Sequence, residues 1–209
     1  MRILIAVCLL IFCGCSSPRI STTWKTEPVF QERYYRILVV AILPEADSLL
    51  RRSIETEAAK SLSGYGYYAV SALSIFGPKG LAASSQEETY LKLCNKGIDA
   101  VLTFALVPEL ENTIVNTGHY IRPNSFYYDR MWNYRKMQSA PDFAVLDKKY
   151  IWETIMFDLL TLQAISVIRT YPLADYPHNE ITNKLPGLVF KRMIKEKLIQ
   201  QKKALMKAF

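Results

Sequence analysis

An uninterrupted apolar run from Ile37 to Leu43 constrains the fold of this chain more than any other stretch. The run is rich in β-branched residues and is stopped by Pro44, so its length is that of a strand. It shows no alternation of apolar and polar residues, which predicts that both faces of the strand are covered. We therefore expect residues 37 to 43 to form the central strand of a sheet against which helices pack.

The residues after this strand predict a helix with one apolar stripe. Asp47 or Ser48 is expected to cap its start, and Gly64 and Gly66 are expected to end it. Apolar residues recur every four positions and predict the buried face, which comprises Leu50, Ile54, Ala58 and Leu62. Charged residues on the other side are expected to turn outward, namely Arg51, Arg52, Glu55 and Lys60.

Two more strands and a second helix are expected before residue 108. Residues 67 to 73 and residues 99 to 107 have the apolar, β-rich composition of strands. Residues 86 to 96 lie between them and predict a helix that Gly97 ends, with an inward face of Tyr90, Leu91 and Cys94. Right-handed crossovers then place the first strand between the second and the third in a parallel sheet.

The C-terminal part predicts a hairpin and a helix. Residues 151 to 157 and 164 to 171 are β-rich runs with a short connection, which is typical of an antiparallel hairpin with one buried and one partly wet face. A last helix is expected from Leu185 to about Gln201, with Pro186 in its first turn and an apolar stripe of Val189, Phe190, Met193, Ile194 and Leu198. The expected fold class is α/β (α+β): a three-stranded parallel βαβαβ core extended by an antiparallel hairpin, with helices packed on the sheet and a C-terminal helix.

The first fifteen residues predict where the protein is located in the cell. Arg2 is followed by about ten apolar residues, which is the range of a signal peptide and about half of the ~20 residues that a membrane span needs. Gly14 then stands directly before Cys15. This order resembles the lipobox of bacterial lipoproteins, and the resemblance implies that Cys15 is acylated and becomes the first residue of the mature protein. A plain signal peptide or an uncleaved anchor remains the alternative.

This reading divides the chain into three parts. Residues 1 to 14 are the expected lipoprotein signal peptide, residues 15 to 35 a lipidated tether, and residues 36 to 203 a single α/β domain. Acyl chains on Cys15 would hold the protein to a membrane. Ser16 and Ser17 lack the aspartate that implies retention in the inner membrane of enterobacteria, so the expected location is the outer membrane, facing the periplasm.

Charge and cysteine content exclude several classes of function. The formal net charge is +7, but residues 191 to 207 hold seven basic side chains and one acidic one, so the excess is concentrated near the C-terminus. A solvated helix face explains it, with anionic lipid or an acidic partner as the alternative, and we predict no nucleic-acid partner. In the mature chain Cys94 would be the one cysteine besides Cys15, which excludes an intramolecular disulfide and a cysteine metal site.

No pattern of residues predicts catalysis. His119 and His178 are the two histidines, and neither has a second ligand at metal-binding spacing. No strand leads into Ser63-Gly64-Tyr65-Gly66, so this segment does not have the pattern of a nucleophile elbow. Cys94 is expected to be a small core residue. We therefore expect a protein that is not an enzyme, with no metal and no cofactor.

One segment has the composition of a binding surface. Residues 108 to 142 form an aromatic insertion in which tyrosine, tryptophan and arginine are interleaved, and these residue types are enriched at binding hot spots. An extended hairpin packed on its own domain is the alternative. The candidate partner-binding residues are Tyr120, Arg122, Phe126, Tyr127, Tyr128, Arg130, Trp132 and Tyr134. The expected partner is an envelope protein or a second copy of the chain.

Several short motifs together resemble a family of uncharacterised bacterial envelope lipoproteins of the Bacteroidetes type. They are Thr23-Trp24-Lys25, Ile37-Leu38-Val39-Val40, Gly66-Tyr67, Gly97 to Leu102 and Trp152-Glu153-Thr154. The α/β domain of that family is similar to the N-terminal domain of TolB and to the periplasmic domain of the curli-secretion lipoprotein. The resemblance implies a non-enzymatic outer-membrane lipoprotein with a binding or assembly domain. The alternative is a subunit of an oligomeric envelope secretion or transport assembly.

Overall fold

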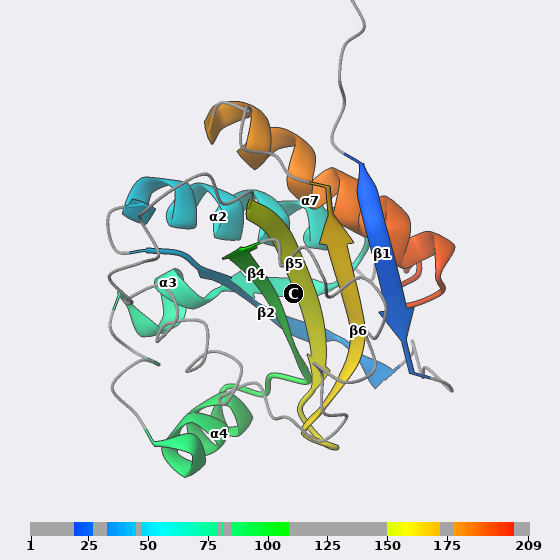
Figure 1. Cartoon of the computed structure of the whole chain (residues 1–209). Coiled ribbons are helices and arrows are strands. Elements are labelled where there is room, and N and C mark those ends of the chain that lie inside the picture. The colour runs from blue at the N-terminus through cyan, green and yellow to red at the C-terminus, as the bar shows by residue number, and fades with distance from the viewer. Residues whose placement is uncertain are drawn as a thin grey trace, which may run out of the picture.

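A six-stranded mixed sheet forms the centre of the molecule (Figure 1). The computed structural model describes residues 19–26, 33–44, 47–78, 81, 85–108, 150–171 and 178–202. The strands are β1 (Ile20–Lys25), β2 (Arg36–Ile42), β3 (Tyr68–Ser71), β4 (Ala100–Pro108), β5 (Tyr150–Asp158) and β6 (Gln163–Thr170), in the spatial order β1-β6-β5-β4-β2-β3. The helices are α2 (Ser48–Gly64), α3 (Ala72–Phe76), α4 (Gln86–Asn95) and α7 (His178–Lys195).

The parallel core has the predicted arrangement. β2 lies between β3 and β4 and is parallel to both, with Leu38 opposite Val70 on one side and Val101 on the other. Every residue of β2 after Arg36 is buried, as an apolar run without alternation predicts. The fold class is therefore α/β as expected. β3 is shorter than predicted because Ser71 caps α3 by accepting a hydrogen bond from Ser74 N (3.3 Å).

The predicted hairpin is also present, but it is not wet on one face. β5 pairs antiparallel with β4 and β6, and both faces of β5 and β6 are buried. Two charged residues of the hairpin are paired with one another inside the protein. Glu153 on β5 accepts hydrogen bonds from Arg169 on β6, directly opposite, with the Arg169 Nε and Nη2 atoms each 2.6 Å from Oε2. These two residues therefore pair with one another across the strands, where the alternating sequence had predicted contact with water.

A sixth strand lies inside the segment expected to be a tether. Ile20–Lys25 pairs antiparallel with β6 and forms one edge of the sheet, and Ser21 Oγ donates to Thr170 O (3.0 Å). Trp24 is partly buried against the core. The threonines of this segment have high strand propensity, and an edge strand tolerates polar side chains. The polar composition of this segment therefore predicted a tether, although its residues form a strand.

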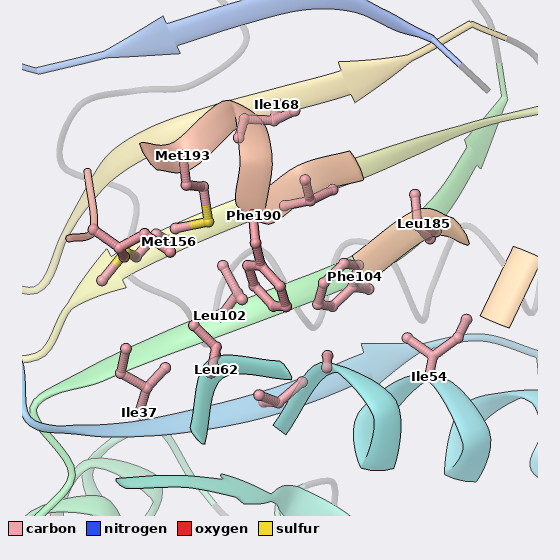
Figure 2. Packing of buried hydrophobic residues seen from close by; sticks show 14 of the residues in the cluster. Ile37, Ile54, Leu62, Leu102, Phe104, Met156, Ile168, Leu185, Phe190 and Met193 are labelled. Atoms are coloured by element: carbon pink, nitrogen blue, oxygen red, sulfur yellow. The ribbon is translucent and has the colours of Figure 1, made fainter. Parts of the chain in front are cut away.

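Apolar clusters lie on both faces of the sheet. One cluster joins the sheet to α2 and α7, and Figure 2 shows Phe190 of α7 placed over Leu102 and Phe104. The Phe104 and Phe190 rings meet edge to face, with centroids 6.5 Å apart, a geometry that aromatic pairs favour. The second cluster contains Ala72 of α3 and Leu93 of α4. The connection through α2 runs from β2 to β3, and the connection through α4 runs back across β2 to β4. Because these directions are opposite, right-handed crossovers put α2 and α4 on opposite faces.

Three helices end in the same backbone motif. In each, a residue with positive φ donates to a carbonyl three residues back and the next residue donates to one five residues back. The positive-φ residues are Gly66, Gly97 and Lys197, and the residues that follow them, Tyr67, Ile98 and Leu198, are buried. The glycines end α2 and α4 as predicted. α7 ends at Lys195 and not near Gln201, because Lys197 takes the left-handed conformation that usually requires glycine.

The faces of the helices differ from prediction at several residues. The predicted stripe of α2 is buried, but so is Glu55, which was expected outside. Asp47 is the N-cap residue of α2, yet its side chain makes no capping hydrogen bond. In α4 the buried residues are Thr89 and Leu93, whereas Leu91 and Cys94 are exposed.

α7 also differs from prediction in where it begins. It starts at His178, so Pro186 lies in its interior, and Ile194 of the predicted stripe is exposed. Throughout the described ranges, no helix combines the length and the apolar character that crossing a membrane requires.

Candidate binding surface

The residues predicted as sites from the sequence lie outside the described residues. This applies to Cys15 and to Tyr120, Arg122, Phe126, Tyr127, Tyr128, Arg130, Trp132 and Tyr134. Their roles therefore stay predictions. The two residues that border the aromatic insertion are placed: Pro108 ends β4 and Tyr150 begins β5, and they pair across the two strands.

Glu55 is a buried acid at the carboxyl end of the parallel strands. Ligands of open α/β sheets usually bind at this end, so Glu55 requires an explanation. It is fully buried and accepts hydrogen bonds from Ala41 N (3.0 Å), Leu73 N (2.8 Å), Ser71 Oγ (2.7 Å) and Arg51 Nε (3.4 Å). These donors come from β2, α2 and the β3–α3 junction. The carboxylate is therefore a structural link between elements and is not available as a general acid or base.

Among the residues that the structure describes, the other reactive side chains do not form a site. Cys94 is exposed on α4, and its hydrogen bond with Tyr90 raises the pKa of that phenol. A lone exposed thiol has neither the base nor the charge that activates a nucleophile. No group of three or more metal-ligating side chains occurs within the residues that the structure places.

A cluster of aromatic and cationic side chains lies at the amino end of the parallel strands. We call it the tyrosine surface, and it consists of Tyr35, Arg36, Tyr68 and Lys202. Tyr35 and Tyr68 are 52% and 51% exposed, and their rings stack with centroids 6.5 Å apart and planes 13° from parallel. The Arg36 guanidinium lies 4.7 Å from the Tyr68 ring centroid, and Lys202 Nζ lies 6.0 Å from that of Tyr35. Both distances are those of cation–π contacts.

Backbone hydrogen bonds hold this surface in place. The Asp99 carboxylate, just before β4, accepts from the backbone N–H groups of Tyr35 (2.9 Å) and Arg36 (2.7 Å). Tyr68 N donates to Tyr35 O (2.9 Å), which fixes the two tyrosines relative to one another. Arg36 and Tyr68 therefore project from the first positions of paired strands, and Tyr35 directly precedes β2.

The segment after α7 completes the surface. Lys202 N donates to Tyr65 O (2.9 Å), Lys202 Nζ donates to Tyr34 O, and Lys202 Nζ also lies 4.6 Å from the Tyr67 ring centroid. Gly66 allows this approach, because a Cβ atom there would lie 2.8 Å from Lys202 Cβ and from Lys202 O. A residue without a side chain is thus required where the C-terminal segment meets the α2–β3 turn.

Two buried tyrosines support the surface from behind. Tyr34 is buried and its hydroxyl donates to Asp158 (3.0 Å), which also binds Arg33. Burial, and then the neighbouring Asp158 charge, raise the pKa of Tyr34. Burial likewise raises the pKa of Tyr67, whose hydroxyl accepts from Gln200 N (3.0 Å). Both phenols are therefore held in the neutral form.

A signal for the tyrosine surface is present in the sequence but was not recognised. Tyr34-Tyr35 precedes β2 and Tyr67-Tyr68 opens β3. In a strand, successive side chains point to opposite sides. The first tyrosine of each pair is buried and the second is exposed. Two Tyr-Tyr pairs at the starts of neighbouring strands therefore indicate one exposed tyrosine at the start of each strand. The strand register places Arg36 opposite Tyr68, so Tyr35 and Tyr68 stack with an offset of one position.

The comparisons with known proteins give a loose structural likeness. No family model matches the chain, and no curated protein matches it. Two solved structures of PelC dodecamers from Paraburkholderia phytofirmans are similar to it, each at 10% sequence identity. One, a point variant, has a TM-score of 0.39 and the match covers 80% of this chain and 94% of that chain. The other has a TM-score of 0.41, and the match covers 87% of this chain and 99% of that chain. Likenesses this loose carry no information on function.

Proposed function

We propose that this chain is an envelope lipoprotein that acts by binding and not by catalysis. In this proposal Cys15 carries the acyl chains, the protein faces the periplasm from the outer membrane, and the α/β domain presents the tyrosine surface to a protein partner. The observation that carries the proposal is the stacked and half-exposed pair of Tyr35 and Tyr68 between two cations.

Exposed aromatic side chains of this kind favour a binding role. Tyrosine and arginine are over-represented at binding hot spots, and a tyrosine pair that already stacks loses little side-chain entropy on binding. Arg36 adds to this, because its guanidinium lies against the exposed Tyr68 ring and presents a positive charge beside it. A whole interface buries about 1,600 Å², far more than two tyrosines offer, so the tyrosine surface would be the centre of a larger contact.

The aromatic insertion remains a second proposed contact. Its composition supports partner binding for the same reason, since tyrosine, tryptophan and arginine are the residue types of hot spots. The partner of either surface is proposed to be an envelope protein or a second copy of this chain.

The anchor is tested by labelling cells with a radioactive or clickable fatty acid. The wild-type chain should carry the label, and Cys15→Ala should not, because the thiol that accepts the acyl chain is gone. A wild-type chain without label would contradict the proposal.

The binding role is tested with paired variants. We expect the double variant Tyr35→Ala/Tyr68→Ala to lose the crosslinks that the wild-type chain forms through this face in intact envelopes. Leu91→Ala is the matched control, because Leu91 is 50% exposed, lies on α4 and does not belong to the tyrosine surface. The proposal fails if the crosslinks survive in the double variant, or if Leu91→Ala removes them equally.

A subunit of an oligomeric secretion or transport assembly is the second candidate. It is favoured by the two edges of the sheet: within the described residues β1 pairs with β6 alone and β3 pairs with β2 alone, so each has one side open. Open strand edges can extend a sheet into another subunit. The mass of the detergent-solubilised protein distinguishes the two candidates, because a closed assembly of many subunits would exceed the one or two copies that the first candidate allows.

A further inference from the structure

The position of β1 bears on how the domain sits relative to the membrane. β1 begins at Ile20, only five residues after Cys15, and pairs with the last residues of β6. Figure 1 shows the start of β1 beside the arrowhead of β6. A fully extended chain advances at most ~3.6 Å per residue, so Ile20 lies within roughly 18 Å of Cys15.

Several strand ends meet where β1 begins. Ile20 is opposite Thr170, Trp152 N donates to Thr170 Oγ1 (3.1 Å), and Pro108 is opposite Tyr150. We call this the tether end of the sheet. The tyrosine surface is at the other end, where Arg36 is opposite Tyr68. Along the 8 residues of β6 the two ends are roughly 23 Å apart, at ~3.3 Å per residue.

The exposed side chains at the tether end suit a headgroup layer. Arg19 and Tyr171 are both exposed, Tyr171 at 54%, and Tyr171 N donates to Arg19 O (3.0 Å). Tyrosine is enriched at membrane interfaces, and arginine binds phosphate oxygens through paired hydrogen bonds. Leu49, in the first turn of α2 after the same end of β2, is also exposed. An arginine, a tyrosine and a leucine therefore stand on the side from which the anchor departs.

We propose that the tether end of the sheet rests on the lipid headgroups, with Arg19 and Tyr171 in contact with them, and that the tyrosine surface points away from the membrane. The proposal rests on the acylation of Cys15 in the proposed function. It adds an orientation and a further surface, whose partner is a phosphate-bearing lipid headgroup layer. It also explains how a short tether leaves the tyrosine surface accessible, since the length of the sheet separates that surface from the lipid.

Quenching by a headgroup-labelled nitroxide lipid tests the orientation. The acylated full-length protein, in a Cys94→Ser background, is placed in phosphatidylcholine and phosphatidylglycerol vesicles with a fluorophore at Tyr171→Cys or at Leu160→Cys. Leu160 is 76% exposed in the β5–β6 turn at the far end of the sheet. We expect quenching to be several-fold stronger at position 171. Ser21→Cys, exposed beside Tyr171, replaces Tyr171→Cys if that variant does not fold.

The outcomes separate this proposal from the proposed function. Mass spectrometry of the same preparation reports acylation of Cys15, and an unacylated wild-type chain overturns the anchor and the orientation together. An acylated protein with equal quenching at positions 171 and 160 lies on its side, and stronger quenching at position 160 means the reverse orientation. Either result overturns the orientation alone. Cys15→Ser with the same labels is the control and should show no quenching at either position.

Discussion

At the scale of single residues, the buried carboxylate of Glu55 leads to a prediction about stability. Its carboxylate is fully buried and accepts from two backbone N–H groups, one hydroxyl and one guanidinium. Glu55→Gln removes the charge. It also puts an NH2 group, which donates, in the place of a carboxylate oxygen whose neighbours are themselves donors. Hydrogen bonds to charged groups contribute about 1.5–3 kcal/mol each, so we expect a loss of at least about 2 kcal/mol in the free energy of unfolding, measured with urea.

A nearby glutamate provides the control for this prediction. Glu57 lies two residues away on α2, its side chain is 39% exposed, and it pairs with the exposed Lys60 at 3.9 Å. Exposed pairs of this kind contribute about 0–1 kcal/mol, so Glu57→Gln should change the unfolding free energy by less than about 0.5 kcal/mol. Equal urea midpoints for the two variants would show that the buried network does not stabilise the fold.

Tyr34 predicts how stability changes at high pH. Its pKa is raised in the folded protein, so the unfolded chain loses this proton first, near its ordinary value of about 10. The stabilisation is therefore complete below about pH 10 and falls as the pH rises above it. Tyr34→Phe should lower stability at pH 8 by about 1 kcal/mol through the lost bond to Asp158. It should also make the decline above pH 10 shallower by up to about 1.4 kcal/mol per pH unit.

Unfolding curves at successive pH values check the Tyr34 prediction. Tyr171→Phe is the control, because it removes the same hydroxyl from an exposed tyrosine. An unchanged slope in Tyr34→Phe would mean that this phenol does not control base denaturation.

At the scale of secondary-structure elements, the end of α7 offers a stabilising change. Lys197 has φ 58° in a motif where glycine is the usual residue, with Leu198 N donating to Met193 O (2.8 Å). A left-handed conformation costs a residue with a Cβ about 1–2 kcal/mol. Lys197→Gly should raise the melting temperature, by an equivalent of up to about 1 kcal/mol. Lys195→Gly is the control, because it lies inside the last turn, and it should lower the free energy of unfolding by about 1 kcal/mol. If both variants raised stability, or both lowered it, the result would contradict the motif.

At the end of α2 the glycine is already present, and replacing it should destabilise the protein. Gly66 has φ 89°, and a Cβ atom there would overlap the backbone of Lys202. Gly66→Ala should therefore lose about 1–3 kcal/mol of unfolding free energy, and it should detach the C-terminal segment from the tyrosine surface. Gly64→Ala is the matched control, because a Cβ there has open space and replaces a helical glycine. It should be neutral or stabilising in the same thermal melt.

At the scale of the whole molecule, the sheet joins both apolar clusters into one unit. Neighbouring residues of β5 belong to different clusters, Met156 to the α2–α7 side and Phe157 to the other. Neither cluster can come apart while the sheet remains intact. Urea unfolding followed by far-UV circular dichroism and by tryptophan fluorescence should therefore give coincident transitions. Two separate midpoints would mean that one face of the sheet unfolds on its own.

The sequence by itself determined the parallel core. The β2 run, the stripe of α2 and the ends of α2 and α4 follow from local rules, namely side-chain periodicity and the conformational freedom of Gly66 and Gly97. These rules depend on residues a few positions apart, so a single chain displays them. The crossover rule then set the order of the three parallel strands.

The tertiary structure decided everything that depended on distant partners. Glu55 is buried because donors from β2, β3 and α3 converge on it, and a threonine-rich stretch becomes β1 because β6 offers it an edge. Lys197 ends α7 because Leu198 finds a place in the core. Tyr35 and Tyr68 form one surface because strand pairing joins positions far apart in the chain. In each case the free energy of burial or pairing outweighs a local preference, and local sequence records only the preference.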